Sequence, residues 1–141
     1  MIEHGIYNLL TNNAALTAVI GSEIFFGVNP NITNKNMWVV FTRNGTIPSD
    51  TKGDESSTGK SYLDTASITI NVYGRQAEKV GDVSKAVRAA LDRNSGTFAG
   101  CEIQSIQYKS QTSMFSYVSE LTEEGLFQIN QTYDCRFVPS Y

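Results

Sequence analysis

The chain has 141 residues, 14 acidic and 11 basic side chains and a net charge of −3, which suits one domain with one hydrophobic core. It has no run of lysine or arginine, so nucleic-acid binding is not expected, and no apolar run approaches the roughly 20 residues that span a bilayer. The opening Met-Ile-Glu-His lacks the basic and apolar segments of a signal peptide, so we expect a cytosolic protein without membrane contact.

The N-terminal part predicts two helices and a short strand. Apolar side chains recur on one face of residues 2–12, which predicts a helix, although Gly5 weakens this prediction. Asn13 is placed to cap a second helix over residues 14–20. The sequence Ile-Phe-Phe at residues 24–26 then predicts a strand.

Two strands separated by a long polar segment are expected next. Residues 37–41 are continuously apolar, which indicates a strand covered on both faces, or covered on one face and in contact with another subunit on the other. Residues 66–73 alternate apolar and polar side chains, as in a strand with one buried face. Residues 44–65 are rich in Gly, Ser, Thr and Asp, so we expect a mobile excursion between antiparallel strands 37–43 and 66–73.

A helix is predicted directly after the second of these strands. Gly74 ends the strand alternation, and apolar residues then recur every three or four positions through residues 76–92. Because the strand and the helix each carry one apolar surface and are joined by a short turn, they are expected to pack on each other. This strand-turn-helix is the expected centre of the fold.

The last third of the chain predicts two long strands. The apolar parity of residues 101–109 changes partway, which predicts a β-bulge near Gln104–Ser105. Residues 110–124 fit either an extension of this strand or a covering loop. Residues 127–137 show the longest alternation in the chain and predict the final strand.

The predicted fold class is α+β in a single domain, residues 1–141. The elements combine into a four- to five-stranded, largely antiparallel or mixed sheet with helices packed on one face. Cys101 and Cys135 both fall in predicted strands, so we expect buried free thiols.

The sequence favours no catalytic, cofactor-binding or metal site. The segment Gly53–Ser61 has five residues between its glycines instead of the four of a phosphate-binding loop, and it leads into a strand instead of a helix. His4 is the only histidine, which rules out a cluster of histidine ligands. A small metal-dependent enzyme remains an alternative, with a divalent cation held by the carboxylates Asp50, Asp54, Glu55 and Asp64.

The polar segment and nearby tyrosines are the best candidates for contact with a partner protein. Tyrosine offers a large contact area with a polar group, and charged side chains can set the register between partners. The candidate interface residues are Asp50, Lys52, Asp54, Glu55, Lys60, Tyr62 and Tyr73.

The order of motifs carries a family resemblance. A leucine-rich segment that ends in glycine, Leu16–Gly21, precedes an apolar strand that ends in arginine, Trp38–Arg43. A hydrophobic strand, Gly-Arg and an alanine-rich helix follow at Ile68–Leu91. This order resembles the tail-completion proteins of long-tailed bacteriophages, also called tail terminators or tail-to-head joining proteins, over most of residues 2–92. Typical members have a proline before the apolar strand, where this chain has Asn36-Met37.

The resemblance implies a structural virion protein and not an enzyme. Members form a ring, commonly a hexamer, that ends tail-tube polymerisation and presents a surface to the head connector. The implied partners are further copies of the chain, the tail tube protein and a head-connector or neck protein, with no cofactor, membrane or sequence-specific nucleic acid. The implied location is the head–tail junction of the virion, after assembly in the bacterial host cytoplasm. A protein-interaction module that forms no ring is a further alternative.

Overall fold

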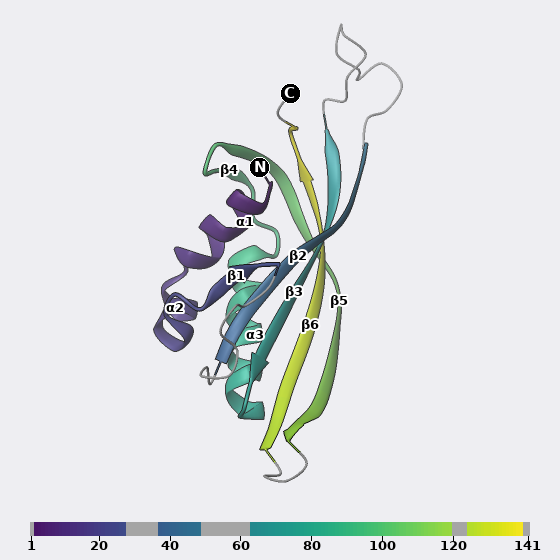
Figure 1. Ribbon diagram of the computed structural model, residues 1–141. Helices are drawn as coiled ribbons and strands as arrows, with labels where there is room; N and C mark the ends of the chain where they lie inside the picture. Colours follow the sequence, from purple (N-terminus) through teal and green to yellow (C-terminus); the bar gives the residue numbers. More distant parts are fainter. Residues whose placement is uncertain (1, 28–36, 49–62, 120–123, 140–141) are drawn as a thin grey trace, which may run out of the picture.

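The computed structural model of the chain describes residues 2–27, 37–48, 63–119 and 124–139. In these residues, three α-helices cover one face of a six-stranded sheet with the order β1-β2-β3-β6-β5-β4 (Figure 1). The predicted α+β class, with a mixed sheet and helices on one face, is confirmed. The strand beyond the predicted five is β4 (Gly96–Phe98), whose three residues, Gly-Thr-Phe, lack the run of apolar side chains that predicted the equally short Ile24–Phe26 strand.

The N-terminal elements match the predicted ones closely. Helix α1 (Ile2–Thr11) is followed by α2 (Ala14–Ile20), and the Asn13 side chain caps α2 by accepting a 2.9 Å hydrogen bond from the Leu16 N–H. Strand β1 (Ile24–Phe26) pairs in parallel with β2. No helix in the described part of the chain is long and apolar enough to cross a membrane.

The first long strand pair extends beyond its predicted ends. Strands β2 (Met37–Pro48) and β3 (Asp64–Gly74) are antiparallel as predicted, but residues 44–48 and 64–65 pair as strand and are not loop. Polar residues can form strand in these segments because the neighbouring strand satisfies their backbone hydrogen bonds, while their side chains on one face are exposed to solvent. A register shift between Arg43 and Gly45 absorbs one extra residue. The rest of the predicted mobile excursion, residues 49–62, lies outside the described residues.

The predicted apolar strand is buried on both faces. Trp38, Val39, Val40 and Phe41 are each at most 6% exposed, although their side chains alternate across the sheet. The side chains of Val39 and Phe41 belong to the main hydrophobic core, whereas Trp38 and Val40 lie on the opposite face.

Helix α3 (Ala77–Leu91) packs on the centre of the sheet, as predicted. Its apolar face meets the buried row of β3, and the two together form the middle of the core. These residues are Val80, Val83, Val87, Leu91, Ala66, Ile68, Ile70 and Val72.

Strands β5 (Cys101–Ser119) and β6 (Glu124–Phe137) form the longest pair. A register shift between Ile103 and Ser105 confirms the predicted bulge, and the ambiguous stretch after residue 109 continues as strand. Cys101 and Cys135 are buried free thiols, as predicted, and burial raises the pKa of Cys135 to about 12.

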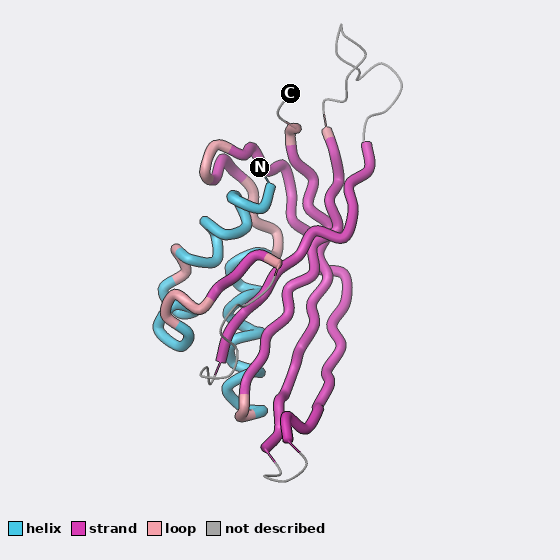
Figure 2. Tube along the Cα trace, in the orientation of Figure 1, coloured by secondary structure: helices cyan, strands magenta, loops and turns pink. Residues whose placement is uncertain are grey.

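The sheet is strongly twisted. Figure 2 shows the sheet twisting along its length, and it shows that the described ends of the β2–β3 pair and of the β5–β6 pair lie at opposite ends of the molecule. Because the described helices lie on only one side, no described helix packs on the other face of the sheet.

Candidate interaction surface

The face of the sheet away from the helices carries rows of polar and aromatic side chains. These side chains alternate along β3 and β6 with the buried core residues. The half-buried members are Ser67, Thr69, Asn71, Tyr73, Gln128, Asn130, Thr132 and Asp134. Uncharged polar groups dominate this face, which suits contact with a protein surface better than contact with a charged polymer.

An aromatic and amide cluster lies near one end of this face. We define the cluster as Trp38, Tyr73, Met114, Gln128 and Asn130. The Trp38 and Tyr73 rings stack with their centroids 5.2 Å apart. The Gln128 side-chain amide donates to the Tyr73 hydroxyl oxygen at 3.4 Å and to the Asn130 side-chain oxygen at 2.6 Å, and the Asn130 amide approaches the Met114 sulfur at 3.7 Å. The cluster thus spans four adjacent strands, β2, β3, β6 and β5.

Only one of the predicted interface residues falls in the described part of the chain. Tyr73 belongs to the cluster, where burial raises the pKa of its phenol. The other predicted residues, Asp50, Lys52, Asp54, Glu55, Lys60 and Tyr62, lie outside the described residues. Sequence reasoning missed Gln128, Asn130 and Met114, although the first two share the outward parity of the final predicted strand, which is the signal that would have identified them.

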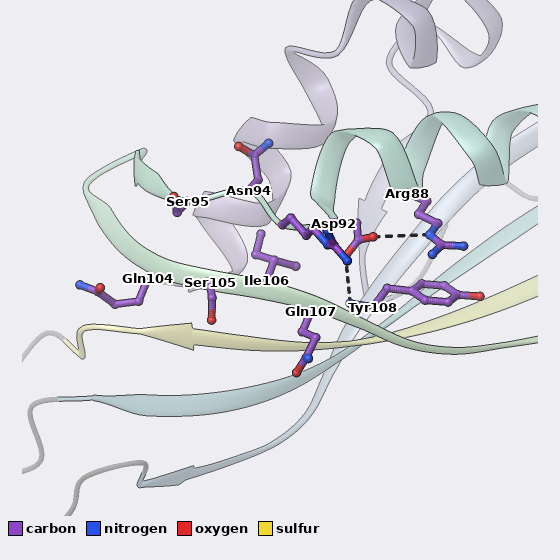
Figure 3. Close-up of a pocket in the computed structure, with 10 residues that line it drawn as sticks. Arg88, Asp92, Asn94, Ser95, Gln104, Ser105, Ile106, Gln107 and Tyr108 are labelled. Atoms are coloured by element: carbon purple, nitrogen blue, oxygen red, sulfur yellow. Dashed lines mark hydrogen bonds and ion pairs between the residues drawn. The ribbon is translucent and has the colours of Figure 1, made fainter.

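A second feature is a hollow between the last turn of α3 and strand β5 (Figure 3). The Arg88 guanidinium lies 3.8 Å from the centroid of the Tyr108 ring, and its Nε lies 3.6 Å from the Asp92 carboxylate. The Tyr108 backbone N–H donates to the same carboxylate at 3.3 Å. These contacts attach the end of α3 to the edge of β5, so Arg88, Asp92 and Tyr108 have a structural role.

The proposed metal-binding carboxylates are only partly described. Asp64 lies in β3, whereas Asp50, Asp54 and Glu55 fall outside the described residues. Within residues 2–27, 37–48, 63–119 and 124–139, no group of three or more His, Cys, Asp or Glu side chains is placed to hold a metal ion.

Comparison with known proteins gives one family match and matches to 15 solved chains. Residues 4–134 match the family model described as tail completion protein gp17. A solved chain from the virion of a native gene transfer agent particle has a TM-score of 0.67 at 15% identity, covering 96% of this chain and 92% of that chain. This similarity establishes a shared fold.

A second solved chain, whose description states no function, has a TM-score of 0.48 at 14% identity, covering 92% of this chain and 91% of that chain. That similarity is too low to support an argument. A search of curated protein sequences gave no match.

Proposed function

Because the chain belongs to the tail completion protein gp17 family, a family of structural phage-tail proteins, we propose that it caps the tail tube as a homo-oligomeric ring. The ring, a hexamer in this proposal, ends tube polymerisation and forms the interface to the head connector. The observation that carries the proposal is the family match, which extends over residues 4–134 of the 141. The solved chain with the same fold comes from the virion of a gene transfer agent particle, which supports a place in a virion.

The proposed partners are further copies of the chain, the tail tube protein and a head-connector or neck protein. Assembly takes place in the cytoplasm of the bacterial host, and the finished protein lies at the head–tail junction. The polar outer face of the sheet supports protein partners, because its uncharged hydrogen-bonding groups suit a protein interface. In this proposal the protein has no catalytic role.

The experiment that tests this proposal is electron microscopy of particles from a phage that lacks the gene. Overlong tails without heads are the expected result, because an uncapped tube continues to polymerise. Tails of normal length that fail to join heads would replace capping with a joining role after termination. Intact, infectious particles would overturn the structural role altogether.

We also propose that the segment between β2 and β3 contacts a neighbouring molecule in the assembly. Its length and its charged residues, Asp50, Lys52, Asp54, Glu55 and Lys60, support this proposal, since charges at the rim of an interface set register and association rate. Tyr62 supplies contact area in the same segment.

Deleting residues 50–60 is expected to prevent tail completion in a complementation assay. A matched variant that replaces the same residues by an equal length of Gly and Ser separates loss of contacts from loss of chain length. If both variants complement as well as the wild type, this segment has no role in assembly.

A further inference from the structure

Strand β5 has a hydrogen-bonding partner along only part of its outer edge. Strand β4 pairs with it from Cys101 to Ile103, the Arg93 N–H then donates to the Ile106 carbonyl at 2.8 Å, and the Tyr108 N–H donates to the Asp92 carboxylate (Figure 3). Beyond this point residues 109–114 are all exposed, and no described segment pairs with that side of them. The backbone donors and acceptors of this segment are therefore available to another strand.

Strand β2, at the other side of the sheet, likewise has a hydrogen-bonding partner along only part of its outer edge. Strand β1 pairs with it from Val39 to Phe41, and the Gly27 N–H adds a 3.0 Å bond to the Phe41 carbonyl. Residues 42–47 continue the strand with no described partner on that side. We call residues 42–47 the β2 edge and residues 109–114 the β5 edge.

We propose that the β5 edge of one copy pairs in antiparallel fashion with the β2 edge of the next copy, so that one sheet runs through neighbouring subunits. This inference rests on the proposed ring and names the contact that builds it. Strand addition to an exposed edge is an established mode of protein recognition, because the main-chain hydrogen bonds themselves supply affinity.

The strand directions favour this pairing. Strands β2 and β3, β3 and β6, and β6 and β5 are each antiparallel, so β2 and β5 run in opposite directions. A copy rotated by one step about a ring axis that is moderately tilted from the strands keeps its strand directions approximately, so it presents its β2 antiparallel to the first copy's β5. The contact uses different surfaces on the two copies, and it produces a closed ring if the rotation closes.

The positions of the two open edges set a stagger between copies. Through the registers of the sheet, Ser110–Met114 lies level with Trp38–Thr42, which is the part of β2 that β1 partly covers. For the β5 edge of one copy to lie beside the β2 edge of the next, the two copies must be shifted along the strands by about four to six residues, or ~13–20 Å. The four strands from one β5 to the next occupy ~19 Å, so the slip corresponds to a strand tilt of ~35–45°, which is the tilt of closed β-barrels.

Exposed apolar side chains support the same contact. Ile47 is 67% exposed on the β2 edge and Met114 is 56% exposed on the β5 edge, and both lie on the outer sheet face. A slip of about six residues places Ile47 opposite Thr112 and diagonal to Met114, within reach of both side chains. Pairing therefore buries two of the large apolar side chains that the subunit leaves exposed, which favours association.

The charged residues at the two edges do not oppose this pairing. The Arg43 guanidinium lies 3.0 Å from the Glu3 carboxylate, and Lys109 lies 3.5 Å from the Asp134 carboxylate. Because each cation has its own carboxylate partner, the approach of the two edges brings together no uncompensated like charges.

Disulfide trapping in assembled tails tests this inference. A variant with both Ile47→Cys and Thr112→Cys, supplied to a phage that lacks the gene, is expected to give a ladder of covalent oligomers on mild oxidation. The native thiols do not interfere, since Cys101 and Cys135 are buried and burial raises the pKa of both. The matched control, Ile47→Cys with Lys85→Cys on the exposed face of α3, is expected to give no ladder.

Lysine substitutions give a second measurement that does not depend on oxidation. Ile47→Lys and Met114→Lys are expected to lower the yield of infectious particles at least tenfold while the purified subunit keeps its thermal stability. Val19→Lys is the control, because Val19 is 48% exposed and lies on helix α2, which belongs to neither edge. Full infectivity of both edge variants would contradict the pairing.

The outcomes separate the inference from the proposed function. A ring seen on the tails without a ladder would overturn the edge pairing and leave the ring standing. Tails that carry no ring would overturn the proposed function, and the pairing with it. If the control cysteine pair gave as large a ladder as the edge cysteine pair, the disulfides would come from random collisions between subunits, and this result would also overturn the pairing.

Discussion

The indole ring of Trp38 stacks on the phenol ring of Tyr73, with ring centroids 5.2 Å apart and planes inclined by 16°. The two residues are direct cross-strand partners in the β2–β3 pair, on the face of the sheet away from the helices. Trp38 is only 2% exposed, so this stack anchors the aromatic and amide cluster of the candidate surface.

The stack predicts an energetic coupling between its two members. In a double-mutant cycle with Trp38→Leu and Tyr73→Leu, the coupling free energy is expected to be ~0.5–1.5 kcal/mol, measured by urea unfolding. Tyr73→Phe is the control: it keeps the stacked ring and removes only the long hydrogen bond from Gln128. Strictly additive single effects would show that the stacked rings do not interact.

A buried polar network connects β6 to α3 and predicts a second effect. The Tyr133 hydroxyl donates to the Gln131 side-chain oxygen at 2.7 Å, and the Gln131 amide donates to the Ser84 carbonyl at 2.9 Å and to the Gln111 side chain at 3.1 Å. Tyr133→Phe is expected to destabilise the protein by ~1–2 kcal/mol, because it leaves a buried acceptor without a donor.

The matched control for this network is Tyr108→Phe. The Tyr108 ring contacts the Tyr133 ring edge-on and lies under Arg88, and both contacts survive the loss of its hydroxyl. Its unfolding free energy is expected to stay within ~0.5 kcal/mol of the wild type. Equal losses in the two variants would show that the buried network has no special role.

The buried thiols predict a loss of stability at alkaline pH. Burial raises the pKa of Cys135 to about 12 in the folded protein, against an ordinary value of 9.0. The folded state therefore keeps a proton that the unfolded state loses, so stability is complete below about pH 9 and falls between about pH 9 and 12.

The pH effect can be assigned to this thiol by mutation. The ionisation of Cys135 in the unfolded state contributes up to about 1.4 kcal/mol per pH unit to the decline of the unfolding free energy with pH. Urea unfolding between pH 8 and 10 measures this decline. Cys135→Ala is expected to be less stable at pH 8 but to show a shallower decline with pH. Tyr133, whose pKa burial also raises, remains in both proteins and adds to the decline above pH 10 equally. Identical slopes would rule out Cys135 as the source.

Two helical glycines differ in the space that they leave for a methyl group. A Cβ atom on Gly81 would meet nothing within 4 Å, whereas one on Gly5 would lie 3.1 Å from Ile103 Cδ1 and 3.4 Å from Cys101 Cβ. Gly81→Ala is expected to raise stability by ~0.5–1 kcal/mol through helix propensity. Gly5→Ala is expected to gain less, because α1 packs tightly against β5 at this point, and equal gains in melting temperature would contradict this packing argument.

Local patterns were sufficient for most elements of the fold. The alternation of residues 66–73, the apolar repeat of residues 76–92 and the Asn13 cap are local properties, since a strand or helix reveals its buried face through its own spacing. The change of parity at Gln104–Ser105 likewise indicated a bulge without knowledge of the partner strand. The order of these motifs also carried the family resemblance that the family model confirmed.

The structure was needed wherever a partner strand determines conformation. Residues 110–114, Ser-Gln-Thr-Ser-Met, show no alternation of their own and are strand because β6 pairs with them. Residues 44–48 are strand for the same reason, through pairing with β3. On the candidate surface, the alternation of β3 was enough to place Tyr73 on the outer face. Its contact with Gln128, however, joins two residues that are 55 positions apart in the chain, and it depends on the pairing of β3 with β6.

The sequence alone therefore determined most of the helices and strands, which of their faces are buried, and the family resemblance that the family model confirmed. The tertiary structure alone decided the strand order β1-β2-β3-β6-β5-β4 and, with it, which edges are left without a described partner. The physical reason is that the spacing of apolar side chains shows that a face is buried but not which element buries it. A sheet edge, in contrast, depends on whether another strand lies beside it.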